Sequence, residues 1–191
     1  MAWPTDEIVT GELVSAAQFN RLEALLASDT LDATAAEIEI ASIPAHWTNL
    51  RLTVRARCND PNSSQTLRVR LNGSTASYDS HWITQQTTVV SGNSSADATY
   101  LTAGELPGDG AGTGLFSQAD ILIAGYAGTT RHKTMTGQAF ANWGTAAGSA
   151  IQYLVAGDWR VTDAVTSITI SPSAGSLVTG TEVALYGGGA I

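Results

Sequence analysis

The chain has 191 residues, of which 14% are charged and 43% hydrophobic, and a net charge of −8. This length fits one domain with a sizeable core, or one domain and an arm. The acidic balance argues against a basic nucleic-acid-binding surface, and no stretch approaches the roughly 18 apolar residues of a membrane-spanning helix. Residues 1–7 carry no base, so we expect no signal peptide. Cys58 is the only cysteine, which excludes an intrachain disulfide and a thiolate metal cluster.

The negative charge is concentrated at the N-terminus. Residues 1–39 hold eight acidic residues against Arg21 alone, a net charge of −7, whereas residues 40–191 carry −1. A composition shift of this size marks a segment distinct from the body. We therefore divide the chain into an acidic arm, residues 1–33, and a β-sandwich domain, residues 34–191. The arm is either a solvated segment or one that docks on a basic surface of a neighbour.

A short helix is expected in the arm, over about residues 15–27. Ser15 and Gln18 have the spacing of a capping box, and apolar side chains then recur at helical spacing. A helix of about a dozen residues is marginal in isolation, so its apolar stripe must pack on the body or on a copy of itself. The residues of this predicted assembly stripe are Phe19, Leu22, Leu25 and Leu26.

Two strands of the domain are expected to present arginines outward. Apolar residues alternate with polar ones over 50–58 and over 67–71, as in strands with one buried face. Asn72-Gly73, directly after the second strand, is a strong hairpin signal. Because arginine pairs with carboxylates in bidentate fashion, these residues are either ordinary surface arginines or partners of the arm's acids. The residues of this predicted arginine face are Arg51, Arg55, Arg57, Arg68 and Arg70.

The rest of the domain is expected to consist of short strands. Further candidates, separated by turn sequences, are residues 38–40, 83–90, 98–102, 120–124, 133–140, 151–155, 165–170 and 182–186. About ten strands at this spacing favour an antiparallel sandwich or barrel over an α/β enzyme. The predicted fold class is therefore all-β: an antiparallel β-sandwich, jelly-roll-like, with a short N-terminal arm and helix.

Residue types that carry catalysis or bind metals form no recognisable motif. The glycine-rich stretch 108–114 lacks the Gly-Lys-Ser/Thr ending of a phosphate loop and is expected to be a flexible surface loop. The three histidines share no metal-ligand spacing. Asp79-Ser80-His81 brings triad residue types together, but triads are assembled from separate loops. We expect no enzymatic activity, no cofactor and no metal site.

Tryptophan is well represented, with five residues in a chain that is 7% aromatic. Packing in a core or an interface is the common role of tryptophan, because its side chain buries a large area. Exposed tryptophans on the loops of a β-sandwich would instead stack on sugars. Trp82 and Trp143 are the candidates for such a glycan-binding patch.

The two ends of the chain resemble structural proteins of tailed bacteriophages. Trp3 followed by residues 10–20 (TGELVSAAQFN) is similar to a short N-terminal segment common among these proteins. Residues 164–187, which end in Leu-Tyr-Gly, look like the closing hairpin of phage virion β-sandwich domains. The two arginine-bearing strands and Tyr78 fit the same group, and the resemblance covers about a third of the chain.

This resemblance implies a non-enzymatic virion protein, commonly a trimer, of the capsid decoration (cement), head-fibre or tail-fibre group. Because the chain has no long coiled coil or repeating shaft, we favour a decoration protein that stabilises the head as a homotrimer. Its expected partners are copies of itself and the major capsid protein or other virion proteins, without nucleic acid or membrane. Its expected location is the particle surface, after synthesis in the host cytoplasm.

Two other functions stay open at this stage. The first alternative is a tail-fibre or tail-tip adhesin that binds host-surface glycans through Trp82 or Trp143. A glycan-degrading enzyme is the least favoured reading, since the spacing of the acidic residues nominates no catalytic pair.

Overall fold

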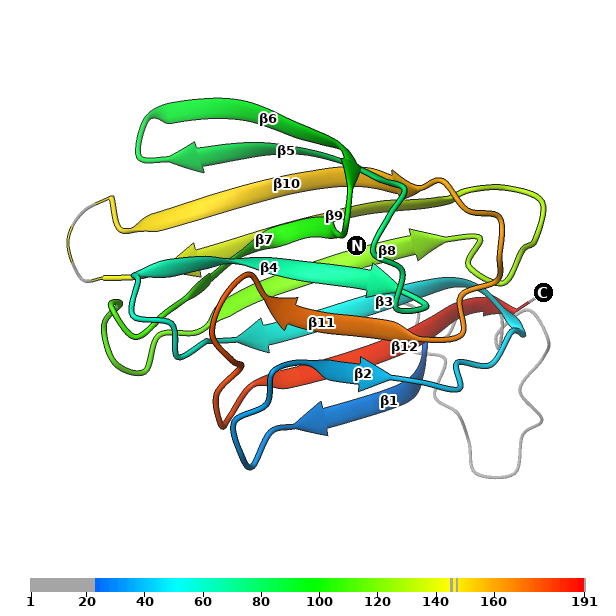
Figure 1. The fold of residues 1–191 in the computed structure, drawn as a ribbon, viewed down its shortest axis with the longest axis horizontal. Coiled ribbons are helices and arrows are strands. Elements are labelled where there is room, and N and C mark those ends of the chain that lie inside the picture. The colour runs from blue at the N-terminus through cyan, green and yellow to red at the C-terminus, as the bar shows by residue number, and fades with distance from the viewer. Residues whose placement is uncertain (1–22, 145, 147, 191) are drawn as a thin grey trace, which may run out of the picture.

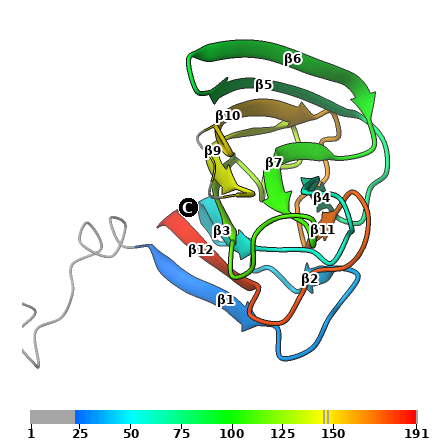
Figure 2. The same ribbon diagram turned by 90° about the vertical axis from the view of Figure 1, so that its left-hand side faces the viewer.

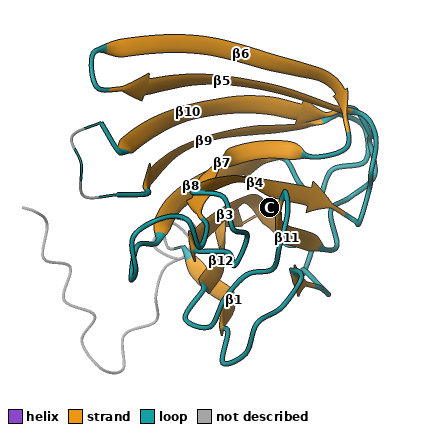
Figure 3. Cartoon of the chain, turned by 60° about the vertical axis from the view of Figure 1, so that its left-hand side comes forward, coloured by secondary structure: helices purple, strands orange, loops and turns teal. Residues whose placement is uncertain are grey.

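The computed structural model describes residues 23–144, 146 and 148–190 (Figure 1). All regular elements in this part of the chain are strands, and it contains no helix (Figure 3). The strands are β1 (Ala24–Thr30), β2 (Ile38–Ile40), β3 (Trp47–Ala56), β4 (Ser64–Leu71), β5 (Tyr78–Gln86), β6 (Val89–Ala98), β7 (Leu101–Pro107), β8 (Ser117–Ala124), β9 (Lys133–Asn142), β10 (Ala150–Trp159), β11 (Ile168–Pro172) and β12 (Glu182–Ala190). The predicted all-β class is confirmed.

The strands form two antiparallel sheets. The large sheet has eight strands in the order β1-β12-β3-β8-β9-β10-β5-β6, and the small sheet has four, in the order β2-β11-β4-β7. Figure 2 shows the large sheet curving around one side of the small sheet, with the β5–β6 hairpin at one end. This arrangement is consistent with the expected antiparallel β-sandwich.

The core lies between the two sheets and follows from the alternation of residues along each strand. Leu50, Leu52 and Val54 of β3 are at most 1% exposed, whereas Arg51 and Arg55 between them point outward. Fully burying each such aliphatic side chain contributes roughly 1.5–3 kcal/mol. The small sheet repeats this pattern on β4, where the fully buried residues are Leu67, Val69 and Leu71.

Tyr78 joins the two sheets from inside. It begins β5 in the large sheet, is fully buried, and its phenol oxygen accepts a hydrogen bond from the backbone N–H of Leu71 in β4, with an N–O distance of 2.7 Å. Burial raises the pKa of Tyr78 to about 12, because ionising the phenol would place a charge in the core. The phenol is therefore a neutral tether between β4 and β5.

The predicted helix over 15–27 is wrong for residues 24–27, which belong to strand β1. Ala24 pairs with Gly187 and Thr30 with Glu182, so β1 is an edge strand of the large sheet. A run of about a dozen residues has weak helical preference, and the ladder with β12 outweighs it. Residues 15–22, with Phe19 and Leu22, lie outside the described residues. The range predicted as the arm, 1–33, thus includes a strand of the main sheet.

The hairpin predicted at Asn72-Gly73 is also wrong, although the turn itself is present. Both residues have positive φ, and the Leu71 carbonyl accepts a hydrogen bond from the N–H of Ser74 at 3.0 Å. The chain then crosses to the other sheet, so β4 and β5 are not paired. The hairpin that does form joins β5 to β6 through Thr87, inside a segment predicted as one strand.

Candidate functional site

The outer face of the large sheet carries a patch of exposed apolar side chains. Four strands that lie side by side, β8, β9, β10 and β5, contribute one residue each. Their exposed fractions lie between 43% and 56%. We call this set the apolar face; its residues are Leu122, Phe140, Leu154 and Ile83.

The register of the sheet gathers these residues. Leu154 is directly opposite Ile83 on β5 and Gln138 on β9, while Phe140 is opposite Gln118 on β8 and Gln152 on β10. Directly paired residues of neighbouring antiparallel strands have their side chains on the same face, a few ångströms apart. Leu154 and Ile83 are thus direct neighbours, Leu122 and Leu154 line one shallow depression, and Phe140 lies among glutamines of the same outer face.

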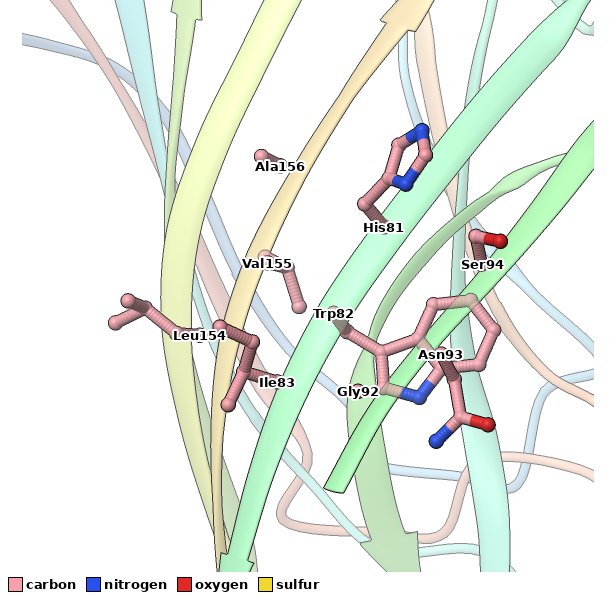
Figure 4. A pocket seen from close by; sticks show the side chains of 9 residues that line it. All are labelled: His81, Trp82, Ile83, Gly92, Asn93, Ser94, Leu154, Val155 and Ala156. Atoms are coloured by element: carbon pink, nitrogen blue, oxygen red, sulfur yellow. The ribbon is translucent and has the colours of Figure 1, made fainter. Parts of the chain in front are cut away.

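A shallow groove of about 460 Å³ runs along this surface where β10, β5 and β6 meet (Figure 4). Its apolar members Ile83 and Leu154 lie beside polar residues His81 and Ser94. Trp82 also lines the groove, but it alternates with its exposed neighbours along β5 and packs against the core. The full lining is His81, Trp82, Ile83, Gly92, Asn93, Ser94, Leu154, Val155 and Ala156.

On β9, β10 and β5 the apolar face has uncharged neighbours. The outward residues on the described central stretches of β9, β10 and β5 include no Asp, Glu, Lys or Arg. They are Thr134, Thr136, Gln138, Phe140, Gln152, Leu154, Ala156, His81, Ile83 and Gln85. A sheet face in water normally alternates core residues with polar and charged ones, whereas the centres of protein interfaces are depleted of charge.

One ion cluster borders the apolar face. The Arg51 guanidinium on β3 contacts both carboxylate oxygens of Asp120 on β8, with its Nε at 2.9 and 3.0 Å, and its second amino group bonds the same carboxylate. The remaining amino group binds Glu23 at 3.0 Å. Hydrogen bonds to Asp120 and then Glu23 raise the pKa of Arg51 above its usual range. An acid of the predicted arm thus pairs with a body arginine within one chain.

The predicted arginine face is divided between opposite sides of the sandwich. Arg51 and Arg55 point outward from the large sheet, whereas Arg68 and Arg70 point outward from the small sheet. Because β3 and β4 belong to different sheets, their outer faces look away from each other. The five residues therefore do not form the single surface that their spacing suggested.

Each arginine outside the Arg51 cluster has a local role. Arg55 pairs with Glu182 at 3.2 Å. The Arg68 guanidinium carbon lies 4.4 Å from the centre of the Tyr100 ring, a cation–π distance. Arg70 donates from Nε to the Thr99 carbonyl at 3.0 Å. These contacts match the ordinary surface-arginine alternative.

Arg57 is buried and fixes the glycine-rich loop. Its guanidinium donates to the Gly112 carbonyl at 2.8 Å and lies 3.5 Å from the Asp109 carboxylate. A Cβ on Gly108 would come within 2.1 Å of the Asn62 carbonyl oxygen, so only glycine fits this approach. The loop is packed and hydrogen-bonded, in contrast to the flexible surface loop expected from its composition.

The two candidate glycan-binding tryptophans are not brought together. Trp82 lies in the middle of β5, whereas Trp143 follows the end of β9, and both pack against the core. Trp143 is instead held by a hydrogen bond from its N–H to the Ser149 carbonyl, at 3.0 Å. The two described residues of the predicted assembly stripe do not share a face either. Leu25 is 57% exposed, whereas Leu26 packs against the core.

The Asp79-Ser80-His81 sequence is structural. Ser80 is fully buried, and its hydroxyl oxygen accepts a hydrogen bond from the Thr102 N–H at 3.0 Å, while His81 points to the opposite face. Within the described ranges, no three His, Cys, Asp or Glu side chains are grouped as metal ligands would be.

Sequence reasoning missed the apolar face. Its signal was present, because 151–155 and 119–123 carry apolar residues at outward as well as inward positions of one strand. Such a run is also typical of a strand buried on both faces, and only the exposed outer surface of the sheet separates the two cases.

The portion of the chain with described structure has no helix of the length and hydrophobicity that crossing a bilayer requires. Comparison of the chain with protein-family models, with curated proteins and with solved structures finds no match.

Proposed function

We propose that this chain is a non-enzymatic structural protein of a tailed-bacteriophage particle, specifically a capsid decoration (cement) protein that assembles as a homotrimer. The observation that carries the assembly is the apolar face, formed by Ile83, Leu122, Phe140 and Leu154. The assignment to a phage particle is supported by the resemblance of the two chain ends to phage virion proteins. The partners in this proposal are other copies of the chain and the major capsid protein, at the particle surface.

The chemistry of the apolar face favours contact between copies. A contiguous exposed apolar surface marks an interaction site, and closed symmetry brings the same patch of each subunit toward a common axis. Charged residues on such a patch would repel their own equivalents. Asp120, beside the apolar face on β8, is paired with Arg51 in the same chain, and Arg51 also binds Glu23. The surface is thus suited to meet a copy of itself.

The ion pairs change one detail of the assembly that the sequence suggested. Arg51 binds Glu23 of its own chain, and Arg55 binds Glu182. We therefore assign cohesion between copies to apolar contact rather than to arm acids docked on a neighbour's arginines. A jelly-roll-like connectivity remains part of the proposal, because β2, β3, β4 and β5 alternate between the two sheets.

Sedimentation of the full chain tests the proposal together with rebinding to particles. The expected species has three times the 19.8 kDa mass of one chain, and it should reattach to phage heads stripped of it. A monomer that fails to reattach would overturn the proposal. Binding to isolated tails but not to heads would move the protein to the tail.

A tail-fibre or tail-tip adhesin is the second candidate, and the groove beside the apolar face is the observation that favours it. There His81 and Ser94, which are directly opposite each other on the outer face, offer hydrogen bonds next to the apolar Ile83, a combination suited to sugar rings. A glycan array should then show specific binding that Ser94→Ala or His81→Ala abolishes. Trp143→Ala, far along the sheet, is the matched control, and equal binding by all three variants would remove this candidate.

A further inference from the structure

The edges of the sheets differ in how they are protected. An edge strand exposes unpaired N–H and C=O groups, and proteins usually protect it by short length, charge, proline, a bulge or burial. β2 has three residues, with the exposed Glu39 at its centre. β7 is largely buried, has a register shift opposite Thr66 and Arg68, and ends at Pro107.

Strand β6 has little of this protection. It is ten residues long and most of it is exposed on both faces. It contains no proline, lysine or arginine, and its single charged residue, Asp97, lies near its end. Its pairing with β5 is regular from Ser95 back to Val89, and the register shift lies beyond Ser95. Val89 and Val90, at the start of the strand, are 61% and 65% exposed.

We infer that β6 is an assembly edge that pairs with strand β1 of the next copy of the chain. This inference rests on the proposed homotrimer and adds an edge contact to the apolar contact proposed for it. A cyclic trimer needs a head-to-tail contact between two different surfaces. Within the described residues the large sheet has two edges, β6 and β1; β1 has a register shift between Leu25 and Ala27 and carries Asp29, and its residues are partly or fully exposed.

The direction of the strands fits this pairing. All seven pairings across the large sheet are antiparallel, so its first and eighth strands, β1 and β6, run in opposite directions. Rotation about an axis along the strands leaves their directions unchanged. β6 of one copy therefore meets β1 of the next as an antiparallel neighbour, which continues the ladder across the junction.

Each edge also carries an exposed apolar side chain on the outer face of the sheet. Val90 is opposite Gln85, and Leu25 is opposite Tyr186, which places both on the outer face of the sheet. Both are more than half exposed. In an antiparallel junction these two side chains lie on the same face of the joined sheet but at its opposite ends, because each stands near the start of its own strand.

Cysteine cross-linking of the full chain tests the pairing. Ser28 on β1 and Ser94 on β6 are exposed and point to the outer face, and the native Cys58 is fully buried. With a short bismaleimide, the double variant Ser28→Cys/Ser94→Cys should yield covalent trimers, whereas each single variant alone should yield none. A mixture of the two single variants should yield covalent dimers.

Each other result has a definite meaning. Covalent dimers from Ser94→Cys alone would show that β6 meets β6 of another copy, and would overturn the inference. A trimer by sedimentation without cross-links would also overturn it while leaving the proposed function intact. If the chain sediments as a monomer, both the proposed homotrimer and the inferred β6–β1 pairing are contradicted.

A lysine on the edge gives an independent readout. Ser94→Lys should weaken trimer formation at least about tenfold, because burying an unpaired ammonium in the ladder is unfavourable, and should leave the unfolding temperature of the monomer unchanged. Glu39→Lys, on the edge strand β2 of the small sheet, is the matched control and should assemble like the wild type. Equal assembly by both variants would contradict the inference.

Discussion

The outer faces of the two sheets show opposite chemistry. On the small sheet, Arg68, Arg70 and Glu39 stand between buried aliphatic residues, and the arginines contact Tyr100 and the Thr99 carbonyl. On the large sheet, the outward residues at the centres of β9, β10 and β5 are uncharged, and Asp79 and Asp158 lie only near the ends of β5 and β10. One sandwich thus combines a small sheet with a charged outer face and a large sheet whose outer face is uncharged at the centres of β9, β10 and β5.

This difference shows which surface is suited to remain in water. Charged side chains on the small sheet stay at least partly exposed to water and contact local partners, so this face needs no cover. The apolar face of Ile83, Leu122, Phe140 and Leu154 gains free energy from cover, at about 25 cal/mol for each Å² of apolar surface removed from water. Assembly is therefore expected to bury the apolar face of the large sheet and to leave the outer face of the small sheet in water.

The largest predicted effect comes from placing charge on the apolar face. The double variant Ile83→Lys/Leu154→Lys should raise the dissociation constant of the assembled protein at least about a hundredfold, because two central apolar contacts are replaced by ammonium groups. Both positions are more than half exposed in the single chain, so the fold should be retained. Sedimentation over a range of concentrations measures the shift.

Glu39→Lys on the small sheet tests the other side of the comparison. This variant adds a positive charge at an exposed strand position of similar kind, and it should leave assembly unchanged. If both variants assemble like the wild type, the two faces do not differ in function. If only Glu39→Lys disrupts assembly, the interface lies on the small sheet.

Local parts of this architecture could be predicted from the sequence. The alternation of Leu50, Leu52 and Val54 with polar residues identified β3 and its outward arginines, and the Asn72-Gly73 turn has the positive φ values that its residues favour. Both features depend on a few neighbouring residues. The pairing of strands does not, since β3 lies between β12 and β8, which are distant in the chain.

The errors follow from this non-local pairing. Leu25 and Leu26 satisfy helical spacing, but β12 offers them a ladder that local sequence does not reveal. Arg51 and Arg68 lie on strands of the same pattern, yet the turn after β4 leads into the opposite sheet, and nothing in the alternation states which sheet a strand joins. The apolar face was missed for the same reason, because exposure of a strand depends on what covers it.

A smaller effect is expected where the two sheets are joined. Tyr78→Phe removes the acceptor of the buried Leu71 N–H and should lower the free energy of unfolding by roughly 1–3 kcal/mol at neutral pH. The tyrosine pKa is raised from 10 to about 12 in the folded protein, so unfolding in this window releases a proton. Wild-type stability should therefore fall as the pH rises from about 10 to about 12.

The variant should lack this part of the alkaline decline. Denaturant unfolding at pH 7, 9, 10 and 11 measures how the free energy of unfolding changes with pH in the wild type and in the variant. These pH values bracket the ordinary tyrosine pKa of about 10. Identical slopes for both proteins would show that Tyr78 ionises in the folded state as it does in water. Assembly at neutral pH should be unaffected, since the phenol is fully buried within one chain.

The smallest predicted effect concerns Arg51, whose ion cluster borders the apolar face on the large sheet. Because Arg51 and its partners are partly exposed, Arg51→Ala should lower the free energy of unfolding by about 1 kcal/mol or less. It also leaves Asp120 uncompensated beside Leu122 and Leu154, so identical charges would face one another in an assembly. Assembly should weaken several-fold and recover at high salt. The double variant Arg51→Ala/Asp120→Asn should restore it, whereas Arg55→Ala, whose partner is Glu182, should assemble normally.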